Sequence, residues 1–292
     1  MRVAEPENEV ESAPENAPEN EGVRAVPARG RFDAALDREL ELIRALAERA
    51  IPGQFFVRRS AALLHGMPMP HLDEPELHLG VLLPARAPRV AGVVGHALSS
   101  HRCSVETLEG IPLTSAASTW VMLGDLTVHE LVAAGDSLIR VHRPGYGRPN
   151  AGKPPLTTLE ELSRAVGLGR WRGMGRLRRA LTLVRRDAWS PMESVLRVSI
   201  VLAGLPEPEL NVDLFDDRGV FLGCFDLVYR RYRIAIEYQG VGHADRYAQD
   251  VERIARLRAE GWIVIEVTKA LMSDRTRVIA RIRAALCERG FA

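Results

Sequence analysis

Two carboxylates in the C-terminal half have the spacing and setting of a metal-binding pair. Asp226 and Glu237 lie in residues 220–239, a stretch rich in β-branched and aromatic residues that reads as two strands turning at Arg230-Arg231. In an antiparallel hairpin centred on that turn, Asp226 pairs with Ala235 and Glu237 is its diagonal neighbour, about 7–8 Å away. Two carboxylates at that separation can bind one hard cation, Mg²⁺ or Mn²⁺. The alternative is a pair of exposed strand acids, which mutual repulsion disfavours.

Two polar residues follow Glu237 and would complete the chemistry of such a site. Gln239 brings an amide that orients water by hydrogen bonding, although it carries no charge and cannot act as a base. His243 titrates in the range of an acid, a base or a phosphate donor; alternatively, it caps the helix that follows. Phosphodiester hydrolysis needs a nucleophilic water and charge compensation, and carboxylate-bound Mg²⁺ supplies both.

A helix start lies upstream of these strands. Ser190, Pro191 and Glu193 form a capping box, with serine at the N-cap, proline at the first helical position and glutamate at the third. The capping box gives Glu193 a complete structural role.

The residues around the hairpin resemble a known nuclease motif. Asp226, ten intervening residues and then Glu237-Tyr238-Gln239 resemble the PD-(D/E)xK motif. Residues 190–290 further resemble the actinobacterial "domain of unknown function 559" proteins, relatives of the very-short-patch-repair endonucleases. A looser likeness to the upstream half of these proteins, which is sometimes compared with abortive-infection antitoxins, runs over residues 55–183. The closer resemblance rests on Pro191–Ser194, Ala203–Glu209, Phe225–Leu227, Glu237–Gly240, His243, Asp250, Arg253 and Gly261–Trp262.

This resemblance implies a restriction-endonuclease-like fold and Mg²⁺-dependent cleavage of DNA. It implies that Glu193 joins the metal cluster and that Arg253 reaches a phosphate; the alternative for Arg253 is a surface ion pair with Asp250. Gln239 departs from the family pattern, because this place usually holds Lys, or Asp in the closer group. Glu266 also departs, since similar proteins often carry a basic residue there.

Hydrophobic periodicity predicts an α/β protein, and the element order after residue 187 is that of an αβββαβ core. The expected helices are Phe32–Ala50, Arg58–His65, Thr119–Leu123, Val128–Ile139, Leu156–Val166, one from Ser190 to a stop at Gly204, Asp245–Glu260 and Arg275–Glu288; the expected strands are Glu76–Leu83, Arg102–Leu108, Ile111–Leu113, Leu210–Leu214, the hairpin and Trp262–Thr268.

Composition shifts divide the chain into four parts. Residues 1–30 repeat Pro-Glu-Asn units and should be a disordered acidic tail. Residues 31–143 form a smaller mixed α/β accessory domain that resembles the antitoxin-like half. Residues 144–186 combine a Pro/Gly-rich linker with an Arg-rich helical segment. Residues 187–292 form the endonuclease-like domain.

The Arg-rich segment has two open interpretations. Residues 169–186 hold seven arginines and no acid, and Arg172, Arg176 and Arg179 fall at i, i+4 and i+7, on one helical face. They would contact DNA phosphates, or they would form the solvated face of an interdomain helix.

Charge and cysteine usage limit the class of protein. The net charge is +1, but residues 31–292 carry 36 basic and 31 acidic residues, a mild excess that suits a nucleic acid partner without proving one. The three cysteines show no metal-site or disulfide spacing. No run of 18 apolar residues exists, so we expect a cytoplasmic protein without a membrane segment.

The sequence therefore predicts a metal-dependent DNA endonuclease acting in repair, restriction or phage defence. The partners would be DNA and, through residues 31–143, a protein of a defence or toxin–antitoxin system. One alternative is an inactive nuclease-fold regulator that binds DNA, with Gln239 marking the lost activity. Another is a protein-interaction module without a nucleic acid role. The pattern does not fix the oligomeric state.

Overall fold

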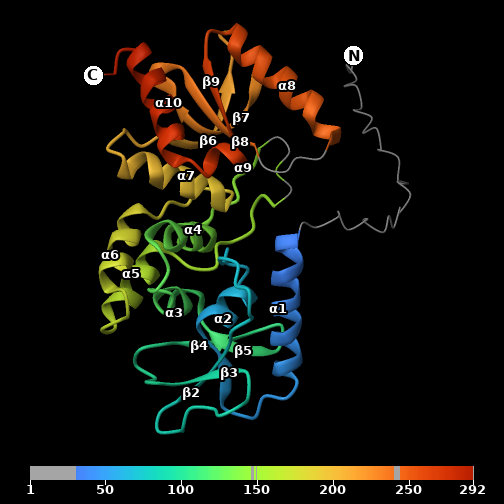
Figure 1. The fold of residues 1–292 in the computed structure, drawn as a ribbon, viewed down its shortest axis with the longest axis vertical. Coiled ribbons are helices and arrows are strands. Elements are labelled where there is room, and N and C mark those ends of the chain that lie inside the picture. The colour runs from blue at the N-terminus through green and yellow to red at the C-terminus, as the bar shows by residue number, and fades with distance from the viewer. Residues whose placement is uncertain (1–30, 146–147, 149, 240–243, 292) are drawn as a thin grey trace, which may run out of the picture.

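The chain forms an α/β structure with two separate mixed sheets. A computed structural model describes residues 31–145, 148, 150–239 and 244–291, and the acidic tail predicted for residues 1–30 lies outside this range. The two sheets stand at opposite ends of an elongated molecule, with helices α3 to α6 between them (Figure 1).

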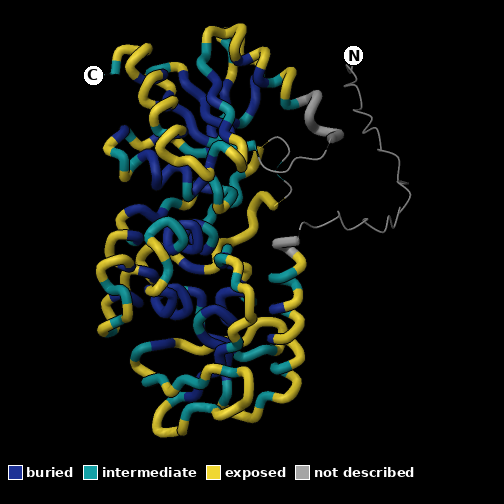
Figure 2. Tube along the Cα trace, in the orientation of Figure 1, coloured by how far each residue is buried: buried dark blue, intermediate teal, exposed yellow. Residues whose placement is uncertain are grey.

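The first sheet has five strands in the order β3-β2-β1-β5-β4. β1 pairs antiparallel with β2 and parallel with β5, while β2 and β3 are parallel and β4 and β5 antiparallel. Its outer strands are poorly covered, and β4 is exposed along its whole length (Figure 2). The elements of this half are α1 (Arg31–Ala47), β1 (Gln54–Phe56), α2 (Arg58–Leu64), β2 (Leu77–Leu82), β3 (Val93–Leu98), β4 (Val105–Leu108), β5 (Ile111–Thr114), α3 (Ala116–Val121), α4 (Val128–Ile139), α5 (Leu159–Gly167) and α6 (Met174–Leu183).

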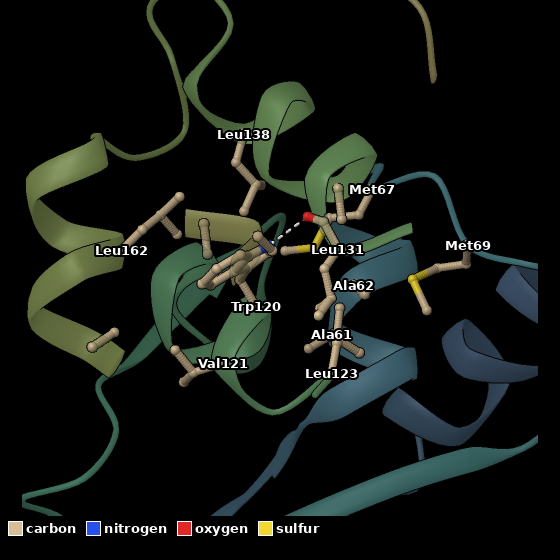
Figure 3. Packing of buried hydrophobic residues seen from close by; sticks show 14 of the residues in the cluster. Ala61, Ala62, Met67, Met69, Trp120, Val121, Leu123, Leu131, Leu138 and Leu162 are labelled. Carbon is tan, nitrogen blue, oxygen red and sulfur yellow. Dashed lines mark hydrogen bonds between the residues drawn. The ribbon is translucent and has the colours of Figure 1, made fainter. Parts of the chain in front are cut away.

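One hydrophobic core joins this sheet to helices α1 to α6. Trp120 lies at its centre, fully buried, and donates its indole N–H to the carbonyl of Leu131 at 2.8 Å (Figure 3). Leu162 of α5 and Leu177 of α6 belong to the same core. The helices of the predicted 144–186 segment therefore pack with residues 31–143.

The second sheet has four strands in the order β6-β7-β8-β9. β6, β7 and β8 are antiparallel and β9 runs parallel to β8, so the predicted order of helix, three strands, helix, strand and helix is observed. The elements are α7 (Pro191–Leu202), β6 (Glu209–Phe215), β7 (Phe221–Tyr229), the 3₁₀ turn η1 (Arg230–Tyr232), β8 (Ile234–Gln239), α8 (Ala244–Ala259), β9 (Ile263–Thr268), α9 (Lys269–Met272) and α10 (Arg275–Glu288).

Helices cover both faces of this second sheet. Ile234 and Ile236 face a core built with α7 and α10, as their alternation predicts. Ala235, on the other face, is buried against Ile254 and Leu257 of α8. β8 is therefore a buried strand at the middle of a three-layer arrangement.

The hairpin register differs from the prediction by two residues. Val228 pairs with Ala235 and Leu227 with Ile236, so continuing the register places Asp226 directly opposite Glu237 and not diagonal to it. The reason is the connection: three residues form η1 and Arg233 adopts a left-handed conformation with φ 50°, where we expected a two-residue turn. The correction brings the two carboxylates closer together.

A buried ionic network joins α4 to α7. Asp136 accepts hydrogen bonds from Arg197 at 3.0 Å, from the Ser194 hydroxyl at 2.7 Å and from the Arg185 backbone N–H at 2.6 Å. Arg197 is completely buried and also donates to Glu207 at 2.7 Å. α7 additionally contributes apolar side chains to the cores of both halves, so it links the two sheets.

Candidate functional site

Asp226 and Glu237 lie side by side on the middle strands of the second sheet. Glu237 is buried and Asp226 is partly buried. An Asp226 carboxylate oxygen accepts a hydrogen bond from the backbone N–H of Tyr238 at 2.7 Å. The predicted pair is therefore brought together on one sheet face, at the edge of the apolar layer formed with α8.

Glu193 reaches the same region from the first turn of α7. Its backbone N–H bonds to Ser190, as the capping box predicts, but its carboxylate accepts from the N–H of Trp189 at 2.9 Å, one residue before the expected partner. The same oxygen accepts from the Asn211 amide at 2.7 Å. Glu193 caps its helix and contributes negative charge beside Asp226.

Arg253 of α8 is the cation of this cluster. Its guanidinium donates to Glu237 at 2.5 Å and to Asp250 at 3.2 Å, and to the carbonyl of Cys224 at 2.8 Å. It also lies over the ring of Phe225. The expected ion pair with Asp250 is present, but the dominant partner is the candidate metal ligand Glu237.

Of the two expected water-positioning residues, the structure describes one. Gln239 is the last residue of β8, half-buried, and pairs with Thr268 of β9. His243 lies outside the described residues.

Glu266 lies next to Glu237 on the parallel neighbour β9 and therefore extends the acidic row. Arg258 of α8 binds it at 2.8 Å. Both side chains are about half exposed, so this second Arg–Glu pair is a solvated counterpart of the buried Arg253–Glu237 pair.

Burial and crowding of like charges raise the pKa of the carboxyl pair. Burial comes first for Asp226, and the charges of Glu237 and Glu193 push its pKa further up, well above the ordinary range. Burial also raises the pKa of Glu237, with Arg253 opposing the shift. Asp226 thus holds its proton more tightly than a free aspartate, as expected for a buried carboxyl group beside two other acids.

The predicted arginine face lies elsewhere in the described structure. Arg172 precedes α6, whereas Arg176 and Arg179 belong to it, and all three are exposed. α6 packs mainly against α4 and α5, and Arg176 donates to the carbonyl of Gly124. These arginines project from the first half of the molecule, away from contact with the carboxylates.

Several polar residues that the sequence did not single out lie around the carboxylates. Asn211 bonds Glu193, and Arg148 forms an ion pair with Asp213 and donates to the Cys224 sulfur at 3.3 Å. The only sequence signal for Asn211 and Asp213 was polar residues inside a strand. Arg148 lay in a segment that composition marked as a linker.

The donor chemistry of the acidic cluster suits a hard divalent cation. Carboxylate oxygens are the ligands that Mg²⁺ and Mn²⁺ prefer. Within the described ranges, no three histidine, cysteine, aspartate or glutamate side chains are arranged as a metal-binding group. Glu193 accepts a hydrogen bond from Asn211, and Glu237 accepts one from Arg253. Metal binding to these carboxylates would require both hydrogen bonds to break or rearrange.

A scan of protein-family models and searches of curated proteins and solved structures found no match to this chain. No helix in the described part of the chain combines the length and apolar character needed to cross a bilayer.

Proposed function

We propose that the protein is a metal-dependent DNA endonuclease of the PD-(D/E)xK type with a restriction-endonuclease-like second half. The observation that carries the proposal is the close placement of the buried Glu237 and the partly buried Asp226, both with raised pKa values and beside Glu193. Neighbouring buried carboxylates destabilise a fold unless a cation compensates their charge, so such a group is typical of a functional site.

Each described residue has a defined task in this proposal. Asp226 and Glu237 would hold Mg²⁺ or Mn²⁺, and Glu193 would add charge from α7. The bound ion would supply a reactive water and charge compensation at the phosphate. Gln239 would orient water by hydrogen bonding. Arg253, displaced from Glu237, would turn toward a phosphate oxygen as a donor.

The second candidate is a nuclease-fold regulator that binds DNA without cutting it. It is favoured by the Arg253–Glu237 bond, because an arginine on a metal-ligand position already neutralises part of the acidic cluster. Gln239, which brings no positive charge, favours the same alternative.

Metal titration and plasmid nicking separate the two candidates. We expect wild type to bind Mg²⁺ or Mn²⁺ in calorimetry and to nick supercoiled plasmid, and Asp226→Asn to lose both, with nicking reduced at least about 100-fold. The matched control is Asp217→Asn, which makes the same chemical change at an exposed position in the turn between β6 and β7. Wild type that binds DNA but neither binds metal nor nicks would establish the regulator instead.

A further inference from the structure

A small basic pocket lies between the two halves. Its volume is about 220 Å³, below the range of about 300–1,000 Å³ that drug-sized ligands occupy. No acidic side chain lines it. Its polar lining consists of Arg140, His142, Arg143, Arg148, Asn150 and Trp189.

The lining residues offer more hydrogen-bond donors than the protein itself uses. Among the described atoms, the buried Nε of Arg148 and the indole N–H of Trp189 have no hydrogen-bond partner, and the Nε of Arg143 has only a longer, 3.5 Å contact with Asp187. The Arg148 side chain is nine-tenths buried and stacks on Trp189 at 4.5 Å. Unpaired buried donors of this kind are uncommon, and an anion beside them would offset the excess positive charge.

Two of these arginines already have carboxylate partners, so they also tie residues 143 and 148 to neighbouring parts of the chain. Arg143 lies 3.5 Å from Asp187, and Arg148 pairs with Asp213. Arg140, in contrast, bonds to the carbonyl of Ala188. Beside it, partial burial and then the charges of Arg140 and Lys153 lower the pKa of His142. Carboxylates outside the lining, those of Asp187, Asp213 and Glu193, therefore partly compensate these arginines, while the side chains that line the pocket are themselves basic or neutral.

The pocket is built onto the same strands as the acidic cluster. Arg143 donates to the backbone carbonyl of Asn211 at 2.9 Å, and the Asn211 side chain holds Glu193. Arg148 touches Cys224, whose carbonyl accepts from Arg253. Asn211 thus links Arg143 to Glu193, and Cys224 together with Arg253 links Arg148 to Glu237.

We propose that this pocket binds a phosphate group of a polynucleotide strand, next to the phosphodiester held at Asp226 and Glu237. The proposal rests on the nuclease function above and names how the substrate is positioned. Arginine forks match phosphate geometry, and the pocket of about 220 Å³ is large enough for a phosphate group.

The test uses the full chain, metal-free buffer and a short fluorescent DNA duplex, with binding followed by anisotropy over a salt series. Ala151→Asp places a negative charge at the exposed rim of the pocket, and Arg143→Gln removes one donor. We expect Ala151→Asp to weaken binding about tenfold and Arg143→Gln to lower the slope of log K against log salt by about one. The matched controls, Ala91→Asp and Arg86→Gln on exposed loops of the first half, should match wild type.

Equal binding by the pocket variants and their controls would overturn the proposal, and so would wild type that binds no DNA. A parallel calorimetric titration with inorganic phosphate identifies the source of the group. Phosphate binding that Ala151→Asp abolishes, with unchanged DNA binding, would assign the pocket to a free phosphate and not to a strand. A protein that is not a nuclease would give a different result. Its wild type would not nick plasmid, yet the pocket variants would still bind DNA more weakly than wild type.

Discussion

At the scale of single residues, two arginines of α8 make the same contact in different surroundings. Arg253 binds the buried Glu237, and Arg258 binds the exposed Glu266, one strand away. Removing one partner of a buried pair leaves an uncompensated charge, whereas an exposed pair contributes little.

Arg253→Met should therefore lower the free energy of unfolding by about 2–3 kcal/mol in metal-free buffer, since Arg253 is about one-fifth exposed and water compensates part of the loss. Arg258→Met should cost less than about 1 kcal/mol. Urea denaturation measures both. Millimolar Mg²⁺ should stabilise Arg253→Met more than wild type or Arg258→Met, because in that variant alone the cation replaces a lost guanidinium beside Glu237. Equal losses in the two variants, or no recovery with Mg²⁺, would contradict this account.

At the scale of elements, the hairpin between β7 and β8 decides how the carboxylates meet. Sequence alone predicted both strands and the placement of Asp226 and Glu237 on one face, with Glu237 as the diagonal neighbour of Asp226. It missed the register, because a left-handed arginine leaves no signature such as an Asn-Gly pair would. The three-residue β1 and the unalternating β3 were missed because their pairing partners lie far along the chain.

Replacing Arg233, the left-handed residue of this hairpin, by glycine should stabilise the protein. Arg233 has φ 50°, which costs a non-glycine residue about 1 kcal/mol. Arg233→Gly should therefore raise the free energy of unfolding by about 0.5 kcal/mol, after loss of its exposed bond to the Glu260 carbonyl. Arg231→Gly, two residues earlier and without a positive φ, should lower it by about 0.5–1 kcal/mol. Chemical denaturation of both variants measures the difference, and a loss in both would show that the turn is not strained.

At the scale of the whole molecule, the site could not have been completed from the sequence. Arg143 is the last residue of the predicted accessory domain, Arg148 comes from the Pro/Gly-rich segment that follows it, and Asn211 comes from the edge strand β6. Their meeting depends on how α4 packs against α7, a contact between residues about 60 positions apart, such as Asp136 and Arg197. Local sequence patterns do not predict contacts between residues so far apart in the chain.

The same contact supports a prediction about cooperativity. Arg197→Met should destabilise the protein by about 3–5 kcal/mol, because Asp136 is 1% exposed and would lose the guanidinium that forms its ion pair. The double variant Asp136→Leu with Arg197→Met should recover most of that loss, since neither charge then remains buried. Calorimetric unfolding reports both values. Two separated transitions in Arg197→Met would show that the network couples the halves, and a double variant worse than the single one would contradict the charge argument.

The contact between Arg148 and Cys224 can be followed through the rate at which the Cys224 thiol reacts. Burial raises the pKa of the Cys224 thiol to about 11, so the thiol is almost entirely protonated at neutral pH. It should therefore be alkylated slowly while Arg148 remains in contact with it. Cys287 is exposed on α10, and Cys103 is buried in the first half. A thiol reagent should modify Cys287 first, and the rate of the later modification of Cys224 would then report how often Arg148 separates from the Cys224 sulfur.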